Sequence, residues 1–260
     1  MTSEYNRRDF LAAASAGATL ALLTSDVLAA KSDSNAAPPT AFPSAFAAIH
    51  QPKPLPFDPA KLDGISEKLI KSHWENNYGG AVKALNAVKQ KLAEFAQDPN
   101  LPAYFYNDIK REQLVRTGSV VLHDQYFGNL GGHDKPDAAL SKALAEAFGS
   151  VDAWEKEFRR IGAGLSGGSG WVVLGLNLHT GLLENYWQWD HQHAPSATLP
   201  ILVMDLYEHA YQMDYGASAA SYIDAFFRNI HWAVAAERLE KAHRAQAAWT
   251  APAKKAGGEA

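Results

Sequence analysis

The stretch LPILVMDLYEHAY, residues 199–211, is a hydrophobic run that ends in a carboxylate, Asp205, and presents an imidazole, His209, four residues later. An ionised aspartate at the end of an apolar strand is costly to desolvate, so we expect it to be protonated, hydrogen-bonded or bound to a metal. An Asp and a His together suit iron, manganese or zinc. A structural hydrogen bond between Asp205 and His209 is the alternative, and the pair alone does not decide between them.

Two further histidines support a metal site. His73 lies in IKSHW, residues 70–74, and His123 lies in VVLHDQYF, residues 120–127. Both stretches have the apolar spacing of helices. Together with the first pair they supply three imidazoles and one carboxylate. The sequence has no cysteine, which excludes thiolate metal sites and disulfide bonds and leaves nitrogen and oxygen as the ligand atoms.

Several sequence blocks occur in the order found in one known family. They are LPF at residues 55–57, His123 followed by Tyr126 and Phe127, GSGW at residues 168–171 and DLYEHAY at residues 205–211. Over residues 55–239 the chain resembles the iron/manganese superoxide dismutases. The GSGW block matches that family as it stands. Tyr126 and Phe127 stand where the family usually has Phe and Trp, and Tyr207 stands where it usually has Trp.

The resemblance implies that His73, His123, Asp205 and His209 bind one iron or manganese ion per subunit, with iron slightly preferred. The implied activity converts superoxide to dioxygen and hydrogen peroxide while the metal alternates between two oxidation states, which nitrogen and oxygen donors tolerate. Two alternatives stay open. One is another mononuclear non-haem iron enzyme acting on oxygen or peroxide, and the other is a metal-binding protein of low activity on the same scaffold.

The resemblance also assigns residues around the metal. It implies that Glu208 reaches across a two-fold interface and hydrogen-bonds a metal ligand of the partner subunit, so we expect a homodimer or a higher homo-oligomer. Trp171, Phe127 and Tyr207 are expected to form an aromatic wall that limits access to the metal. Ordinary core packing explains the same three aromatic residues.

In many relatives a glutamine contacts the solvent molecule on the metal, and this chain lacks it. Ser119, one turn before His123, does not match the position of that glutamine on the helix. The segment WDHQH, residues 189–193, resembles a variant loop in which a histidine takes the role. We therefore expect His191 to be catalytic, with His193 as the alternative because the loop is about one residue shorter than in that variant.

The entrance for the substrate also departs from the family. Asn77 and Ala81 occupy the positions where the family usually has a histidine and a tyrosine after the first ligand. Gln212 replaces the tyrosine that faces this histidine across the dimer in relatives. We expect Asn77 and Gln212 to pair through their amides, and Tyr78, near the helical face of Ala81, to replace the missing catalytic tyrosine. An arginine near the entrance falls at Ala219, which weakens the electrostatic attraction of superoxide.

Apolar spacing predicts an α+β fold whose first part is helical. Residues 64–96 and 106–130 have the spacing of helices, and Pro99 and Pro102 interrupt the segment between them. We therefore predict a two-helix hairpin domain at residues 59–135.

The second part combines strands and helices in a predicted α/β domain at residues 136–246. The expected strands of its three-stranded antiparallel sheet are residues 170–178, 182–189 and 200–205. Helices are expected at residues 207–215 and 222–245. The tail at residues 247–260 is expected to be disordered.

The chain begins with a predicted export signal. Arg7 and Arg8 precede an apolar stretch at residues 11–23, the pattern of a twin-arginine signal peptide at residues 1–30. A membrane anchor is the alternative, but the stretch is shorter than the ~20 residues that span a bilayer. We expect cleavage, no membrane attachment afterwards, and a periplasmic or secreted protein with a flexible linker at residues 31–58. The net charge of -4 provides no basic excess for nucleic acid.

Overall fold

The computed structural model describes residues 43–252. The predicted signal peptide, the first part of the predicted linker and residues 253–260 lie outside the described residues. Within the described part of the chain, helices surround one small sheet, which confirms the predicted α+β class. Among these residues, no helix combines the length and the apolar composition that crossing a membrane requires.

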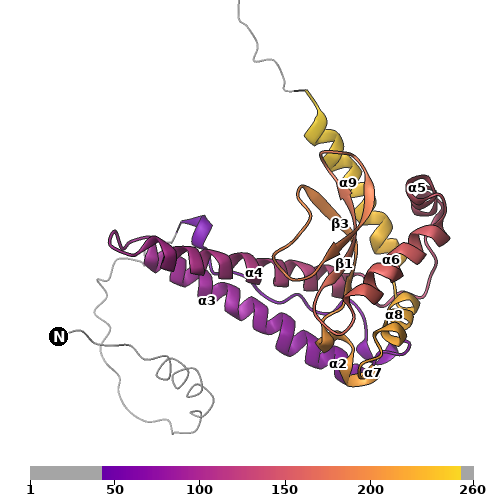
Figure 1. The fold of residues 1–260 in the computed structure, drawn as a ribbon, viewed down its shortest axis with the longest axis horizontal. Coiled ribbons are helices and arrows are strands. Elements are labelled where there is room, and N and C mark those ends of the chain that lie inside the picture. Colours follow the sequence, from indigo (N-terminus) through magenta and orange to yellow (C-terminus); the bar gives the residue numbers. More distant parts are fainter. Residues whose placement is uncertain (1–42, 253–260) are drawn as a thin grey trace, which may run out of the picture. The chain divides into compact units, whose positions relative to one another are not determined.

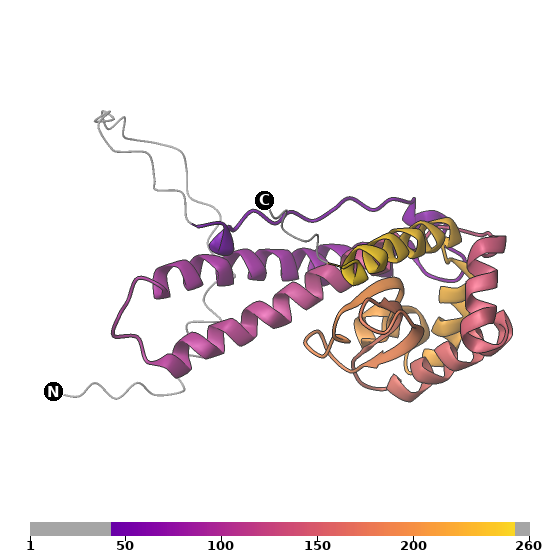
Figure 2. The ribbon, with the colours of Figure 1, turned by 90° about the horizontal axis from the view of Figure 1, so that it is seen from above.

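A pair of long helices forms the first part of the fold (Figures 1 and 2). The first begins as helix α2, Glu67–Ser72, continues as the π-helix η4, His73–Tyr78, and becomes helix α3, Gly79–Phe95. Helix α4, Ala103–Gly128, returns alongside it. The predicted hairpin is therefore present, with a π-helical turn that the apolar spacing did not predict.

Helices and a sheet form the second part. Helices α5, Ala138–Phe148, and α6, Val151–Leu165, precede strands β1, Trp171–Asn177, β2, Leu183–Gln188, and β3, Thr198–Asp205. The sheet is antiparallel with the order β2-β1-β3. The remaining elements are η5, Glu208–Ala210, α7, Gln212–Tyr215, α8, Ala219–Arg228, and α9, Trp232–Thr250. Helix α9 runs four residues into the segment predicted as a disordered tail.

The hydrophobic core lies between the sheet and helices α4, α6 and α9, which contact it. Strand β1 and the second half of β3 are buried almost throughout. Strands covered on both faces have nearly continuous apolar sequences, as residues 171–176 and 201–204 do. The run that precedes Asp205 therefore carries its carboxylate into the interior, where the residue has no exposed surface.

The sequence predicted one helix at residues 222–245, and the structure has α8 and α9 instead. Asn229 lies between them, and its side chain accepts a hydrogen bond from the Asp63 amide and donates to the Asp63 carbonyl. The next residue, Ile230, pairs with Leu130 in an isolated β-bridge. These long-range hydrogen bonds replace those of a continuous helix, and apolar periodicity does not reveal them.

The described end of the predicted linker packs against the hairpin. Residues 47–57, here called the strap, follow the short helix η2, Ser44–Phe46, and run along α3 (Figure 2). The His50 amide donates to Asn86 on α3, and the Asn86 side chain donates back to the His50 carbonyl. The strap is therefore attached to α3 at His50, within the segment predicted as a flexible linker.

Candidate metal centre

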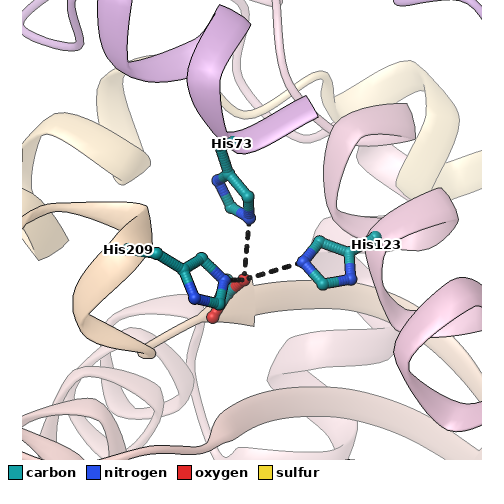
Figure 3. A group of neighbouring side chains, drawn as sticks. His73, His123 and His209 are labelled. Carbon is teal, nitrogen blue, oxygen red and sulfur yellow. Dashed lines mark hydrogen bonds and ion pairs between the residues drawn. The ribbon is translucent and has the colours of Figure 1, made fainter. Parts of the chain in front are cut away.

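Four side chains from four different elements meet in the interior. His73 begins η4, His123 lies in α4, Asp205 ends β3 and His209 lies in η5. One nitrogen or oxygen atom from each residue lies within 4.8 Å of all the others. Figure 3 shows the three imidazoles converging on the carboxylate. Its Oδ2 is 3.2 Å from Nε2 of His73, 3.7 Å from that of His123 and 3.3 Å from that of His209.

Strand pairing fixes the position of Asp205. The residue is opposite Trp171 in the β1–β3 ladder. The Tyr207 amide in the turn after the strand donates to Asp205 Oδ1 at 2.8 Å. The other oxygen, Oδ2, faces the histidines. The chain then turns through η5 and returns His209 to the same carboxylate.

Hydrogen bonding and burial set the protonation of the histidines. Nδ1 of His123 is 2.7 Å from the Ser119 carbonyl oxygen, which can only accept, so Nδ1 carries the proton and Nε2 keeps a free lone pair. Burial lowers the pKa of His73. Burial, with a further contribution from His73, lowers the pKa of His123 to about 3. Both imidazoles are therefore neutral at pH 7, as metal binding requires.

The carboxylate stays charged although it is buried. Burial alone raises the pKa of Asp205, but the electrostatic attraction and the hydrogen bond of the neighbouring His209 outweigh this effect and hold the pKa well below its usual range. Nε2 of His73 and Nε2 of His123 are buried without a hydrogen-bond partner in the described part of the chain. Free imidazole nitrogens gathered around one carboxylate fit a metal ion with three nitrogen ligands and one oxygen ligand.

Three aromatic rings surround the cluster, as predicted for the wall. Phe127 lies 4.9 Å from the His73 ring between centroids. Trp171 lies 5.1 Å from His123, and Tyr207 lies 5.2 Å from His209. Each of the three rings therefore packs on a different histidine of the cluster. Both readings of these aromatics, packing and exclusion, fit the same contacts.

The structure places His191 beside the cluster. The Trp171 indole N–H donates to His191 Nδ1 at 3.1 Å, and the His191 ring stacks on Tyr207 at 4.6 Å with 10° between the planes. The His191 and His123 rings are 6.1 Å apart. Because an indole can only donate, Nδ1 must accept, and the neutral ring carries its proton on Nε2. Burial lowers the pKa of His191, which favours this neutral form.

His193, the alternative to His191, lies on the surface. Its side chain is 59% exposed and its Nδ1 is 2.8 Å from Asp190 Oδ1. The Trp189 indole donates to the same nitrogen at 2.9 Å. Of the two loop histidines, His191 is therefore the one whose ring packs among the residues that surround the cluster.

Gly118 allows the His191 loop to pack on helix α4, and the sequence did not identify it. A Cβ atom at position 118 would lie 1.8 Å from the His191 carbonyl oxygen and 2.9 Å from its carbonyl carbon. Contacts this short are not possible, so only glycine permits the observed approach. The sequence did contain one signal for this contact. Gly118 lies inside a predicted helix, where glycine lowers helix stability by ~1 kcal/mol relative to alanine.

Tyr78 packs on the cluster through its ring and not through its hydroxyl. The ring lies 6.1 Å from His123 and 6.0 Å from Phe127. Its hydroxyl donates to Asp124 and accepts from the Lys53 amide, both outside the four-residue cluster. Tyr78 ends η4, where the wider π-helical turn changes which residues face α4, and such turns are frequent at functional sites.

The residues predicted to act at an interface or at the substrate entrance are close in sequence to the cluster but at least partly exposed. Glu208 and Gln212 are exposed and Asn77 is partly exposed. The predicted partners of these three belong to a second subunit, so their roles stay predictions. Ala81 and Ala219, which stand where the family has a tyrosine and an arginine, are buried.

Comparison with known proteins agrees with this geometry. Residues 136–238 match the family model described as iron/manganese superoxide dismutases, C-terminal domain. The chain is 50% identical over 196 residues to "Superoxide dismutase [Fe]" of Cupriavidus metallidurans, which covers 75% of this chain and 99% of that protein. It is 38% identical over 194 residues to "Superoxide dismutase [Fe]" of Aquifex aeolicus, covering 72% of this chain and 90% of the relative. It is 33% identical over 194 residues to "Superoxide dismutase [Mn] 2" of Haloferax volcanii, covering 73% and 94%.

Proposed function

Since the chain belongs to the iron/manganese superoxide dismutase family, we propose that it is an iron-dependent dismutase, active as a homodimer, that is exported through its twin-arginine signal peptide. Dismutation of superoxide itself follows from family membership and from the His/Asp cluster. The specific additions are the metal, the assembly and the location. A relative's metal supports iron, the exposed face beside His209 supports the dimer, and the arginine pair supports export.

The observation that carries the function is the pair of buried imidazole nitrogens without hydrogen-bond partners, on His73 and His123, facing the Asp205 carboxylate. Asp205 and the histidines would hold one iron or manganese ion. When bound, that ion supplies the one-electron redox chemistry by which two superoxide ions and two protons become dioxygen and hydrogen peroxide. The chain's own residues supply the neutral imidazoles, the single negative charge and the aromatic rings that pack on the histidines.

The residues around the cluster each have a definite task. The Ser119 carbonyl keeps the His123 proton on Nδ1 and so directs its free nitrogen inward. The Trp171 indole keeps the His191 proton on Nε2, which makes that nitrogen a hydrogen-bond donor near the cluster. A third histidine in the cluster argues against an oxygenase, because a site with two histidines and one carboxylate leaves more positions open for a cosubstrate.

Iron is favoured over manganese because the relative at 50% identity is named as an iron enzyme, whereas the manganese relative reported above is 33% identical. The test is to prepare metal-free protein, reload it with iron or with manganese, and measure superoxide decay per bound metal atom. We expect the iron form to be the more active. Equal or higher activity per manganese atom would contradict the choice of iron.

The proposal of a homodimer is supported by the surface beside the cluster. The His209 side chain is 25% exposed, whereas those of His73, His123 and Asp205 are at most 1% exposed. The exposed Glu208 is its immediate neighbour in the chain. A second subunit covering this face would complete the burial of the ligands and receive the glutamate.

A further inference from the structure

Lys53 in the strap is held at three of its atoms. Its backbone N–H donates to the Tyr78 hydroxyl at 2.8 Å, and its carbonyl accepts from the Trp74 indole at 2.9 Å. Its ammonium nitrogen lies 2.7 Å from Asp124 Oδ2. The Lys53 side chain is 71% exposed, whereas that of Asp124 is 14% exposed, so a surface cation pairs with a largely buried carboxylate. The strap is therefore fixed to both helices of the hairpin at this residue.

Asp124 links this contact to the metal centre. Its second oxygen, Oδ1, accepts a hydrogen bond from the Tyr78 hydroxyl, so both carboxylate oxygens are engaged. Asp124 also directly follows the ligand His123 on α4. The Tyr78 hydroxyl donates to Asp124 and accepts from Lys53, and the ring cannot turn away without breaking both bonds.

The ring of Tyr78 separates the metal centre from a surface cavity. It is buried and lies 6.1 Å from the His123 ring, with 28° between the planes. Phe127 lies beside it and also packs on His73. Tyr78 and Phe127 also line a cavity of about 530 Å³, which Lys53 of the strap lines as well. The rings of Tyr78 and Phe127 thus lie between the cavity and the two ligands His123 and His73.

We propose that Lys53 and Asp124 are positioning residues that hold the Tyr78 ring against His123, so that the strap closes one side of the metal centre. The inference rests on metal binding at the four-residue cluster. With Tyr78 held, water in the cavity does not reach His123. With Tyr78 released, water reaches the ligand and the ion is lost faster.

Two conservative substitutions test the proposal in the full chain. Asp124→Asn keeps the size of the side chain and removes the charge that holds Lys53, and Tyr78→Phe keeps the ring and removes the hydroxyl. Lys71→Met is the matched control, because Lys71 pairs with Glu67 on the exposed face of α2. Three measurements are made on each protein: the rate at which iron passes to a chelator, the absorption spectrum of the iron(III) form, and hydrogen exchange of the strap amides without metal.

We expect both test variants to lose iron roughly 10-fold faster than the wild type, the usual scale when residues that orient metal ligands are changed. Their iron(III) spectrum should shift and their strap amides should exchange faster, while Lys71→Met matches the wild type. Faster exchange with unchanged iron release and spectrum would overturn the proposal, because the strap would then be anchored without acting on the metal. Unchanged exchange in both variants would overturn it as well.

Two further results separate this proposal from the proposed function. If Asp124→Asn fails to fold, Lys53→Met removes the ion pair and leaves the backbone hydrogen bonds of the strap, and the same expectations apply to it. If the wild type binds no iron, the choice of metal fails. Hydrogen exchange of the metal-free proteins then still decides whether Lys53 and Asp124 hold Tyr78.

Discussion

Replacing Gly118 by alanine should displace His191 without touching any metal ligand. The new Cβ would lie 1.8 Å from the His191 carbonyl oxygen, and ordinary contact begins at 3.4 Å, so the loop must withdraw by about 1.6 Å. A displacement of about 1 Å at a catalytic group can cost on the order of 100-fold in rate. We therefore expect dismutation per metal atom to fall roughly 10- to 100-fold, as His191→Ala itself should.

The free energy of unfolding of Gly118→Ala should decrease only modestly. Overpacking costs about 1–3 kcal/mol, and the better helix propensity of alanine returns up to about 1 kcal/mol. Gly164→Ala is the control, because nothing lies within 4 Å of a Cβ at that position of α6. It should leave activity unchanged and stabilise the protein by about 0.4–1 kcal/mol.

The assay is superoxide decay per bound metal atom, with urea unfolding of the same preparations. Wild-type activity and wild-type metal content in Gly118→Ala would refute the reasoning. Either the His191 side chain would then keep its position when the loop backbone moves, or His191 would not contribute to catalysis. If His193→Ala carried the loss and His191→Ala did not, the assignment of the loop would be wrong.

Three further predictions concern assembly, export and pH. Glu208→Ala should weaken the dimer and lower metal content together, measured by sedimentation and metal analysis, and a fully loaded dimer would leave Glu208 without the proposed role. Changing Arg7 and Arg8 to lysine should abolish periplasmic activity in cell fractions, and unchanged activity there would exclude twin-arginine export. Metal-free protein should lose stability as the pH falls from 6.5 towards 3, because burial lowers the pKa of His123 to about 3 and the unfolded chain then binds more protons in that window. Urea midpoints that do not change between pH 7 and pH 4.5 would contradict this.

The sequence predicted the ligand set from the local pattern around Asp205 and His209 together with the family resemblance. Asp205 ends an apolar run, and such a run reads as a buried strand whether or not the fold is known. His209 follows at a fixed spacing through a short turn. His73 and His123 needed the family resemblance as well, because a single histidine in a helical stretch is ordinary. The sheet and hairpin followed from periodicity in the same way.

The features that the sequence did not predict depend on long-range contacts. The π-helical turn after His73 cannot be seen in apolar spacing, which assumes one helical period throughout. Lys53 and Asp124 are 71 residues apart in the chain and are common surface residue types, so nothing local marks them as partners. Gly118 is informative only because residue 191 approaches it from a distant loop. Asn229 interrupts a helix by binding the backbone of residue 63.

His73, His123, Asp205 and His209 together form the proposed redox metal centre of this superoxide dismutase. The most direct test compares the wild type with Asp205→Ala, measuring bound iron and manganese by elemental analysis and superoxide decay on the same samples. We predict about one metal ion per wild-type subunit with rapid decay, and loss of most metal and all dismutation in Asp205→Ala, because the variant removes the only carboxylate of the cluster. Full metal content or retained dismutation in Asp205→Ala would contradict the assignment of the centre.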